Sequence, residues 1–313
     1  MTENRVAVEE RVRRDWGLEL PESVFRYHAF LTSMGPAEKR ALDDMELRPF
    51  GIMDVFANPD AQPADGIDVR VHGRYYLDPP EFLTFMHGGS DGLHFGLWFD
   101  DGRTCSGVAS YYTNDAGDLD MTSSTPLEAV RARLELSWRD LHDYYDGDEL
   151  AERKVKLASV RDALTAYETA DRTETGIEYS KKYSFVVPPV LPDRITTLDG
   201  GGALATGETT LRRPPQHRTD PAYFAEVVFN VIRDPEALQA AVTEAKDRCA
   251  AGDPAEALAL GRDLHWASGR DPLREAYAHE LLSAAYQALG RPALAAIADA
   301  HHRHRNLRSV QVL

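Results

Sequence analysis

The chain has 313 residues and a formal net charge of −16 at pH 7, with 43% hydrophobic and 27% charged residues. Its length allows two ordinary domains, and its composition is typical of folded globular proteins. No apolar run approaches the roughly 20 residues of a membrane helix, and the charged stretch 1–14 has the pattern of neither a signal peptide nor an anchor. The negative charge argues against direct nucleic-acid binding, because contacts to phosphate dominate that affinity.

The chain has two cysteines, Cys105 and Cys249, which lie far apart in the sequence. This pair excludes a disulfide framework, and neither residue has the neighbours expected of a metal-binding or redox motif. We therefore expect a reducing compartment, the cytoplasm.

The N-terminal half has the pattern of an α+β domain. Residues 3–15 predict a charged helix, and further helices are expected from Glu22 to about Leu31 and from Ala37 to Asp44. Alternation of Ile67, Val69 and Val71 with polar residues predicts a first strand. Further strands are expected at 82–87, 94–99 and 104–112, with a hairpin turn at Asp101-Gly102 between the last two, and together they predict an antiparallel meander.

The C-terminal half is expected to be mainly helical. A capping box at 125–128 starts a helix to about residue 142, and the acidic stretch after it predicts a domain boundary at 147. The domains are thus 1–147 and 148–313, the second beginning with a helix and containing an extended segment at about 178–215. Beyond it, Asp-Pro pairs predict helix starts with an aspartate cap at Asp220, Asp234, Asp253 and Asp271.

The densest cluster of polar and aromatic residues is Arg74-Tyr75-Tyr76-Leu77-Asp78-Pro79-Pro80-Glu81-Phe82. One interpretation makes Asp78 and Glu81 a functional carboxylate pair. The favoured alternative is a rigid connection between strands, in which Asp78 binds backbone amides. We take Arg74, Tyr75, Tyr76, Asp78 and Glu81 as candidate binding residues.

Two histidine-containing segments are weaker candidates. His87 and His94 flank a glycine-containing stretch that could approach a ligand, although a hairpin loop is the better interpretation; both histidines are kept as candidate binding residues. His301, His302 and His304 alternate with arginines, but lack cysteine or a carboxylate at ligand spacing. Cations at a helix C-terminus interact favourably with the helix dipole, which explains them, and no metal site is expected.

Several motifs together resemble the histone PARylation factor family, whose members redirect poly(ADP-ribose) polymerases toward serine. The most specific is Tyr75-Tyr76-Leu77-Asp78-Pro79-Pro80-Glu81-Phe82. The others follow in the order of the family: Leu20-Pro21-Glu22, Phe50-Gly51-Ile52-Met53, Val186-Val187-Pro188, Leu258-Ala259-Leu260-Gly261-Arg262-Asp263-Leu264 and Leu281-Leu282-Ser283-Ala284-Ala285-Tyr286. The resemblance implies an α/β domain followed by a helical domain, in agreement with the predicted elements.

The resemblance also implies a specific chemistry and shows a departure from it. In the family a glutamate beside an aspartate enters the polymerase active site and deprotonates the acceptor serine. Counting back from Leu258 places this pair at Ala250-Ala251, and alanine cannot accept a proton. The nearest carboxylates, Asp247 and Asp253, are the candidate catalytic residues, although Asp253 has the pattern of a helix cap.

The resemblance further implies a protein partner. The arginine by which the family contacts the polymerase corresponds to Arg212 or Arg213. We therefore expect an accessory protein that acts with an ADP-ribosyltransferase or an ADP-ribosylated partner and is not a self-sufficient enzyme. No tightly bound cofactor is expected, and NAD or ADP-ribose would be reached only through a partner enzyme.

Two alternatives remain. The first is an acidic immunity protein of the SUKH type that binds and neutralises a toxin, suggested by residues 16–31, the glycines at 88–89 and the negative charge. The second is a stand-alone enzyme that uses Asp78, Glu81, His87 and His94.

Overall fold

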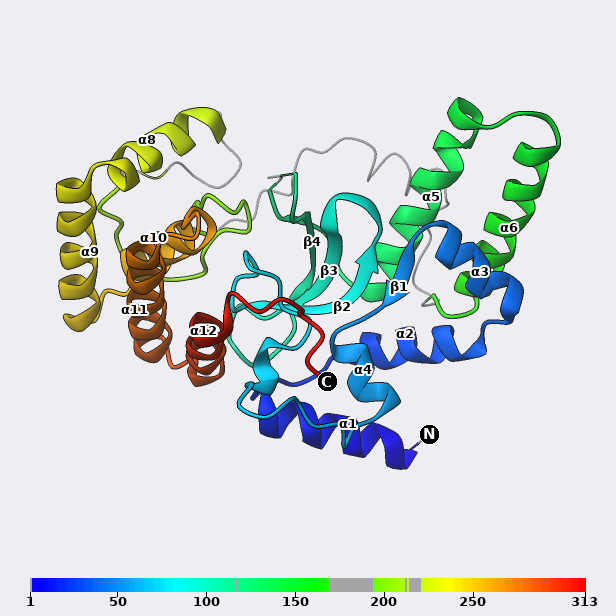
Figure 1. The fold of residues 1–313 in the computed structure, drawn as a ribbon, viewed down its shortest axis with the longest axis horizontal. Helices are drawn as coiled ribbons and strands as arrows, with labels where there is room; N and C mark the ends of the chain where they lie inside the picture. The colour runs from blue at the N-terminus through cyan, green and yellow to red at the C-terminus, as the bar shows by residue number, and fades with distance from the viewer. Residues whose placement is uncertain (1, 116–117, 169–193, 212, 214–220) are drawn as a thin grey trace.

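A computed structural model describes residues 2–115, 118–168, 194–211, 213 and 221–313 of the chain (Figure 1). The N-terminal half contains a five-stranded sheet with helices packed around it, and the C-terminal half is helical. The predicted α+β class is therefore confirmed. Within the described part of the chain, no helix combines the length and the apolar character needed to cross a membrane.

The sheet is an antiparallel meander in which each strand pairs with the next along the chain. Its strands are β1 (Leu47–Pro49), β2 (Phe82–Gly88), β3 (Leu93–Trp98), β4 (Gly107–Tyr112) and β5 (Asp120–Ser123). The strands β2, β3 and β4 confirm three predicted strands, and β4 begins three residues later than expected. The two outer strands, β1 and β5, were not predicted.

The predicted strand at 67–71 is wrong. Val69–Val71 forms a short 3-10 helix, η1, which packs against the helix α12 described below. Asp68 caps it by accepting a hydrogen bond from the backbone N–H of Arg70 at 3.0 Å. Of the three helical residues only Val71 is buried. The alternating pattern thus reflects a capped turn with one anchored valine, because an Asp side chain can satisfy local backbone groups without a neighbouring strand.

Among the described residues before 166, six helices pack against the sheet or against one another. They are α1 (Thr2–Asp15), α2 (Glu22–Ser33), α3 (Pro36–Asp44), α4 (Ile52–Ala57), α5 (Pro126–Tyr144) and α6 (Gly147–Thr165). Thr125 caps α5 by accepting a hydrogen bond from the Glu128 N–H at 3.2 Å, as the capping box predicts. The helix α6 begins at the predicted boundary and packs against α3 and α5 (Figure 1). The division of the chain at residue 147 stays a prediction.

The C-terminal helices pack successively against one another. They are α8 (Pro221–Arg233), α9 (Pro235–Ala250), α10 (Ala255–Trp266), α11 (Pro272–Ala288) and α12 (Pro292–His304). Asp234 and Asp271 cap α9 and α11 with their side chains, as predicted. Asp253 was expected to cap α10, but Pro254 takes the N-cap position and Asp253 forms an ion pair with Arg248.

The segment between the halves is described only in part. Of the extended segment expected at about 178–215, residues 178–193 lie outside the described residues, as does the helix start expected at Asp220. Gly200–Gly202 lies in a tight loop that an antiparallel bridge between Ile195 and Ala203 closes.

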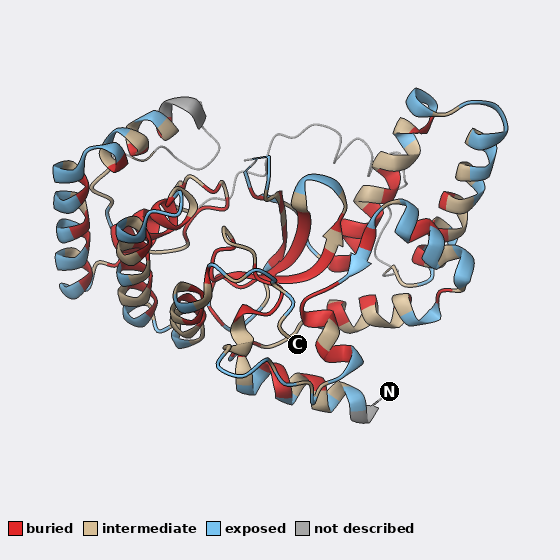
Figure 2. Cartoon of the chain, in the orientation of Figure 1, coloured by how far each residue is buried: buried red, intermediate tan, exposed pale blue. Residues whose placement is uncertain are grey.

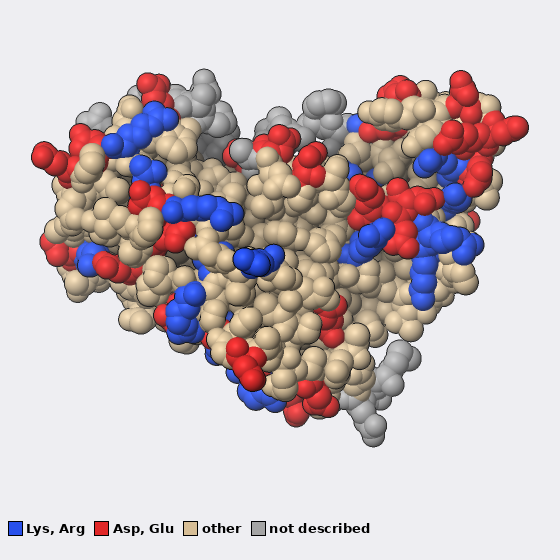
Figure 3. All heavy atoms as spheres, viewed as in Figure 1, with Lys and Arg blue, Asp and Glu red and all other residues tan. Residues whose placement is uncertain are grey.

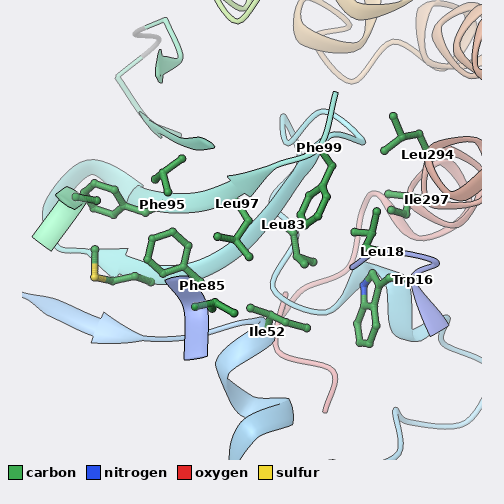
Figure 4. Packing of buried hydrophobic residues seen from close by; sticks show 14 of the residues in the cluster. Trp16, Leu18, Ile52, Leu83, Phe85, Phe95, Leu97, Phe99, Leu294 and Ile297 are labelled. Carbon is green, nitrogen blue, oxygen red and sulfur yellow. The ribbon is translucent and has the colours of Figure 1, made fainter. Parts of the chain in front are cut away.

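One apolar core continues from the sheet into the C-terminal helices. Figure 2 shows buried residues along the sheet and along the inner faces of the helices on both sides of it. In Figure 4, Trp16 and Leu18, which follow α1, lie next to Leu294 and Ile297 of α12. The two halves therefore share their apolar interior.

Candidate functional site

The segment Arg74–Phe82 lies between the two halves and its acidic side chains are enclosed. The carboxylate of Asp78 is fully buried. Its Oδ1 accepts a hydrogen bond from the Tyr111 hydroxyl at 2.6 Å and lies 2.8 Å from His94 Nε2, while its Oδ2 accepts the Tyr75 N–H at 2.8 Å. Burial, together with this carboxylate, raises the pKa of Tyr111 well above its ordinary value. Asp78 thus fixes the turn to two neighbouring strands.

Glu81 belongs to a second buried cluster, which joins the halves. The guanidinium of Arg262, on α10, lies 3.1 Å from Glu81 and 2.6 Å from Asp199. The Tyr286 hydroxyl of α11 donates to Glu81 at 2.9 Å. Burial opposes a charged Arg262, but the two carboxylates outweigh it and raise its pKa. Each charge therefore has an opposite charge in contact, which the cost of burying ions requires.

These contacts favour a rigid connection over a functional carboxylate pair. Asp78 and Glu81 each have their own hydrogen-bond partners, and both are shielded from solvent. The guanidinium of Arg74 donates to the carbonyl oxygens of Pro79 at 2.8 Å and Phe82 at 2.7 Å, so it braces the same segment from inside. An enzyme that used these carboxylates would need to open the interface between the halves.

The remaining candidates near this segment are less enclosed. The Tyr75 hydroxyl lies 3.0 Å from His87 Nδ1. Burial raises the pKa of Tyr75 to about 12 and lowers the pKa of His87. The Tyr76 hydroxyl donates to Glu275 at 2.5 Å and so binds the segment to α11. Tyr75, Tyr76 and His87 are thus only partly buried.

The candidate arginine Arg213 is directed inward. Its side chain is 2% exposed and pairs with Glu256 at 3.0 Å and Asp263 at 2.7 Å, both on α10. Although burial opposes its charge, these carboxylates raise the pKa of Arg213. The guanidinium is thus engaged within the protein rather than presented to a partner. The other candidate, Arg212, lies outside the described residues.

The junction between α9 and α10 is exposed. Ala250 ends α9 and Ala251 follows it, and both alanines face solvent. Asp247 lies one helical turn before Ala250 and is also exposed, and its carboxylate has no hydrogen-bond or ion-pair partner among the described residues. Asp253 is partly buried and pairs with Arg248, and this pairing, against an opposing effect of burial, lowers its pKa. The two candidate catalytic carboxylates therefore differ, one being unpaired and the other engaged.

The three clustered histidines have different surroundings. His301 is buried, His302 stacks on His279 with ring centroids 4.4 Å apart, and His304 accepts a long hydrogen bond of 3.4 Å from the Asp68 N–H. Across the part of the chain that the structure describes, no group of three or more His, Cys, Asp or Glu side chains could hold a metal ion.

The charged partners that join the halves were not identified from the sequence. Arg262 was noted only as part of a helical motif, and Asp199 was not singled out. Ion pairs between segments about 60 and 180 residues apart leave no local spacing pattern, since they depend on how the halves meet. The available signal is the charged pair Arg262-Asp263 within the otherwise apolar stretch Leu258–Leu264, because charged residues are rarely buried without a partner.

Comparison with known proteins defines the family. The family model described as histone PARylation factor 1 matches residues 7–182, which is more than half of the chain. The chain therefore belongs to the histone PARylation factor 1 family. Histone PARylation factor 1 of Danio rerio is 31% identical to it over 98 residues, which is 29% of this chain and 27% of that protein. The chain thus aligns with about a quarter of the length of this relative.

Proposed function

We propose that this protein is an accessory factor that binds an ADP-ribosyltransferase and promotes modification of a protein acceptor. Membership of the histone PARylation factor 1 family supports this proposal. In this proposal the protein catalyses no reaction by itself. The transferase binds NAD, and this chain supplies a binding surface and a proton acceptor. Turnover of NAD by the protein alone would contradict the proposal.

The proton acceptor that we propose is Asp247. The family resemblance puts the usual carboxylate pair at Ala250 and Ala251, which have no ionisable group. Residues three apart on a helix lie on the same face, so Asp247 presents a carboxylate beside the same exposed junction. A base must come within hydrogen-bond reach of the hydroxyl that it deprotonates, and an exposed, unpaired carboxylate is free to do so.

The test is an ADP-ribosylation assay with a transferase catalytic domain, labelled NAD and a serine-containing acceptor peptide, with and without this protein. We expect stimulated serine modification that Asp247→Asn reduces at least tenfold. The matched control is Glu244→Gln, an exposed carboxylate on the same helix, which should leave stimulation unchanged. Binding of the transferase is measured separately by titration calorimetry.

The two measurements separate the parts of the proposal. Binding with stimulation that Asp247→Asn leaves intact would remove Asp247 as the base and leave the accessory role. Neither binding nor stimulation would contradict the accessory role itself and favour a toxin-binding protein, whose partner should then be sought among toxins encoded nearby.

A further inference from the structure

A small cavity lies where the end of α12 meets the Tyr75-Tyr76 segment. Its volume is about 210 Å³, and the basic side chains that line it are Arg74, Arg270, Arg305, His301 and His304. No aspartate or glutamate is among its lining residues. In a chain with a net charge of −16, a cavity lined by three arginines and two histidines is a marked reversal of the overall charge. On the face that Figure 3 shows, acidic and basic side chains are interspersed.

The arginines of the cavity have no carboxylate in contact with them among the described residues. Arg305 donates to the backbone carbonyl oxygens of Tyr76 at 2.9 Å and His265 at 2.5 Å, and Arg74 likewise binds carbonyl oxygens. Burial lowers the pKa of both arginines, in keeping with the lack of a carboxylate in contact with them. Carbonyl dipoles satisfy N–H groups but do not neutralise a cation.

Carboxylates outside the cavity act on these arginines, and each is engaged elsewhere. Asp78 and Glu81 raise the pKa of Arg74 and Glu275 raises that of Arg305, but burial has the larger effect and lowers both pKa values. Asp78 binds His94 and Tyr111, as described above, and Glu275 accepts the hydrogen bond from Tyr76. None of these carboxylates fills the cavity.

His301 gives independent evidence that the cavity receives a ligand. Its side chain lines the cavity and is 98% buried, with a relative exposure of 2%, yet neither ring nitrogen has a hydrogen-bond partner. Buried polar groups are almost always hydrogen-bonded, and each exception calls for an explanation such as an unseen ligand or water. The neighbouring His265, whose ring centroid lies 5.2 Å from that of His301, donates instead to the Asp78 carbonyl oxygen. An acceptor atom in the cavity would give a ring N–H of His301 its missing hydrogen-bond partner.

We propose that this cavity binds a small phosphoryl anion, either free phosphate or diphosphate or the phosphoryl end of an ester. Guanidinium groups bind phosphate oxygens through paired hydrogen bonds, and a histidine N–H adds a further donor. The volume is below the roughly 300–1,000 Å³ of most ligand pockets, which fits a phosphoryl group better than a whole dinucleotide. Arg270 is the exposed arginine of the lining, and Asn306 is exposed as well.

The proposal does not depend on the proposed accessory function, and its test requires no transferase. The full chain in phosphate-free chloride buffer is titrated calorimetrically with inorganic phosphate, diphosphate and ADP-ribose. We expect saturable binding of at least one of the three, with a dissociation constant below about 1 mM, and an accompanying shift of the His301 imidazole signals in NMR spectra. The ligand with the lowest dissociation constant of the three identifies the source of the phosphoryl group.

Two variants assign the binding to this cavity. Arg270→Gln, at an exposed position where folding is not at risk, should weaken binding at least tenfold. Arg308→Gln, an exposed arginine of the same C-terminal region that does not line the cavity, should bind like the unchanged protein. Non-saturable heats with all three ligands, or equal weakening in both variants, would overturn the proposal, since either result would indicate attraction by general charge.

Discussion

The guanidinium of Arg262 lies 3.1 Å from the carboxylate of Glu81, and the side chains are 1% and 3% exposed. Arg262 comes from α10, and Glu81 comes from the turn that leads into β2. Asp199, from the loop between the halves, holds the other side of the same guanidinium at 2.6 Å. Three separate segments therefore meet at one cation.

Replacing this cation should be costly. Arg262→Met leaves two buried carboxylates without their partner, and we expect the free energy of unfolding to fall by about 3–5 kcal/mol. Urea denaturation measures this change. As a control, Arg303→Gln removes an arginine that pairs with Asp299 and Asp68 at the surface and should cost less than about 1 kcal/mol. Equal losses in the two variants would show that the buried cluster contributes no more to the free energy of unfolding than a surface ion pair.

Stability should fall in acid because of buried histidines. Burial, reinforced by Arg305, lowers the pKa of His265 well below its ordinary value, and burial likewise lowers that of His301. The folded protein keeps these rings neutral, whereas the unfolded chain takes up protons below about pH 6.5. Their contribution is thus fully present above that pH and is lost as the pH falls, by up to about 1.4 kcal/mol per pH unit for each histidine.

The variant His265→Gln isolates one of these groups. We measure unfolding by urea at several pH values between 7.5 and 5 and take the difference between the unchanged protein and the variant. This difference should shrink as the pH falls, because only the unchanged protein has this titrating ring. His142→Gln, at an exposed position of α5, is the control. A difference that stays constant or grows in acid would show that His265 is not held neutral.

Gly51 should tolerate no side chain. It has a φ of +62°, and an added Cβ would collide with the carbonyl oxygen of Thr84 in β2. Gly66 has a similar φ of +78° but open space around it. We expect Gly66→Ala to cost about 1–2 kcal/mol for its backbone conformation alone, and Gly51→Ala to cost at least twice as much. Thermal unfolding compares the two, and equal losses would mean that the approach to Thr84 relaxes without cost.

Restoring a carboxylate at the α9–α10 junction should increase activity in the proposed reaction. Ala251→Glu puts a glutamate at the position that the family resemblance indicates, on an exposed residue where it disturbs no packing. We expect at least tenfold greater stimulation of serine modification than with the unchanged protein. Ala251→Gln has the same size without the charge and should give no increase. An equal response to both would exclude a role as base at this position.

Local sequence signals predicted the helices well. Asp234 and Asp271 cap their helices through their own backbone neighbours, so a few residues determine each helix start. The hairpin at Asp101 was equally local, since its carboxylate accepts from Arg103 and Thr104. These features need no tertiary information.

The site was harder to predict, because its contacts come from distant segments. The outer strand β1 has only three residues and pairs with β2 some 40 residues later, so it has no period of its own. The Tyr75-Tyr76 segment was identified as important, but its role between the halves depends on α10, α11 and α12. The basic cavity likewise draws Arg74, Arg270 and Arg305 from three regions, and it was not predicted.

The shared interior that joins Trp16 and Leu18 to Leu294 and Ile297 limits how this protein can meet a partner (Figure 4). Hinge opening between the halves would expose these side chains to water, at about 25 cal/mol for each Å² of apolar surface. Association should therefore proceed by rigid docking onto a preformed surface. Its rate should rise in proportion to partner concentration without reaching a plateau set by a slow conformational step.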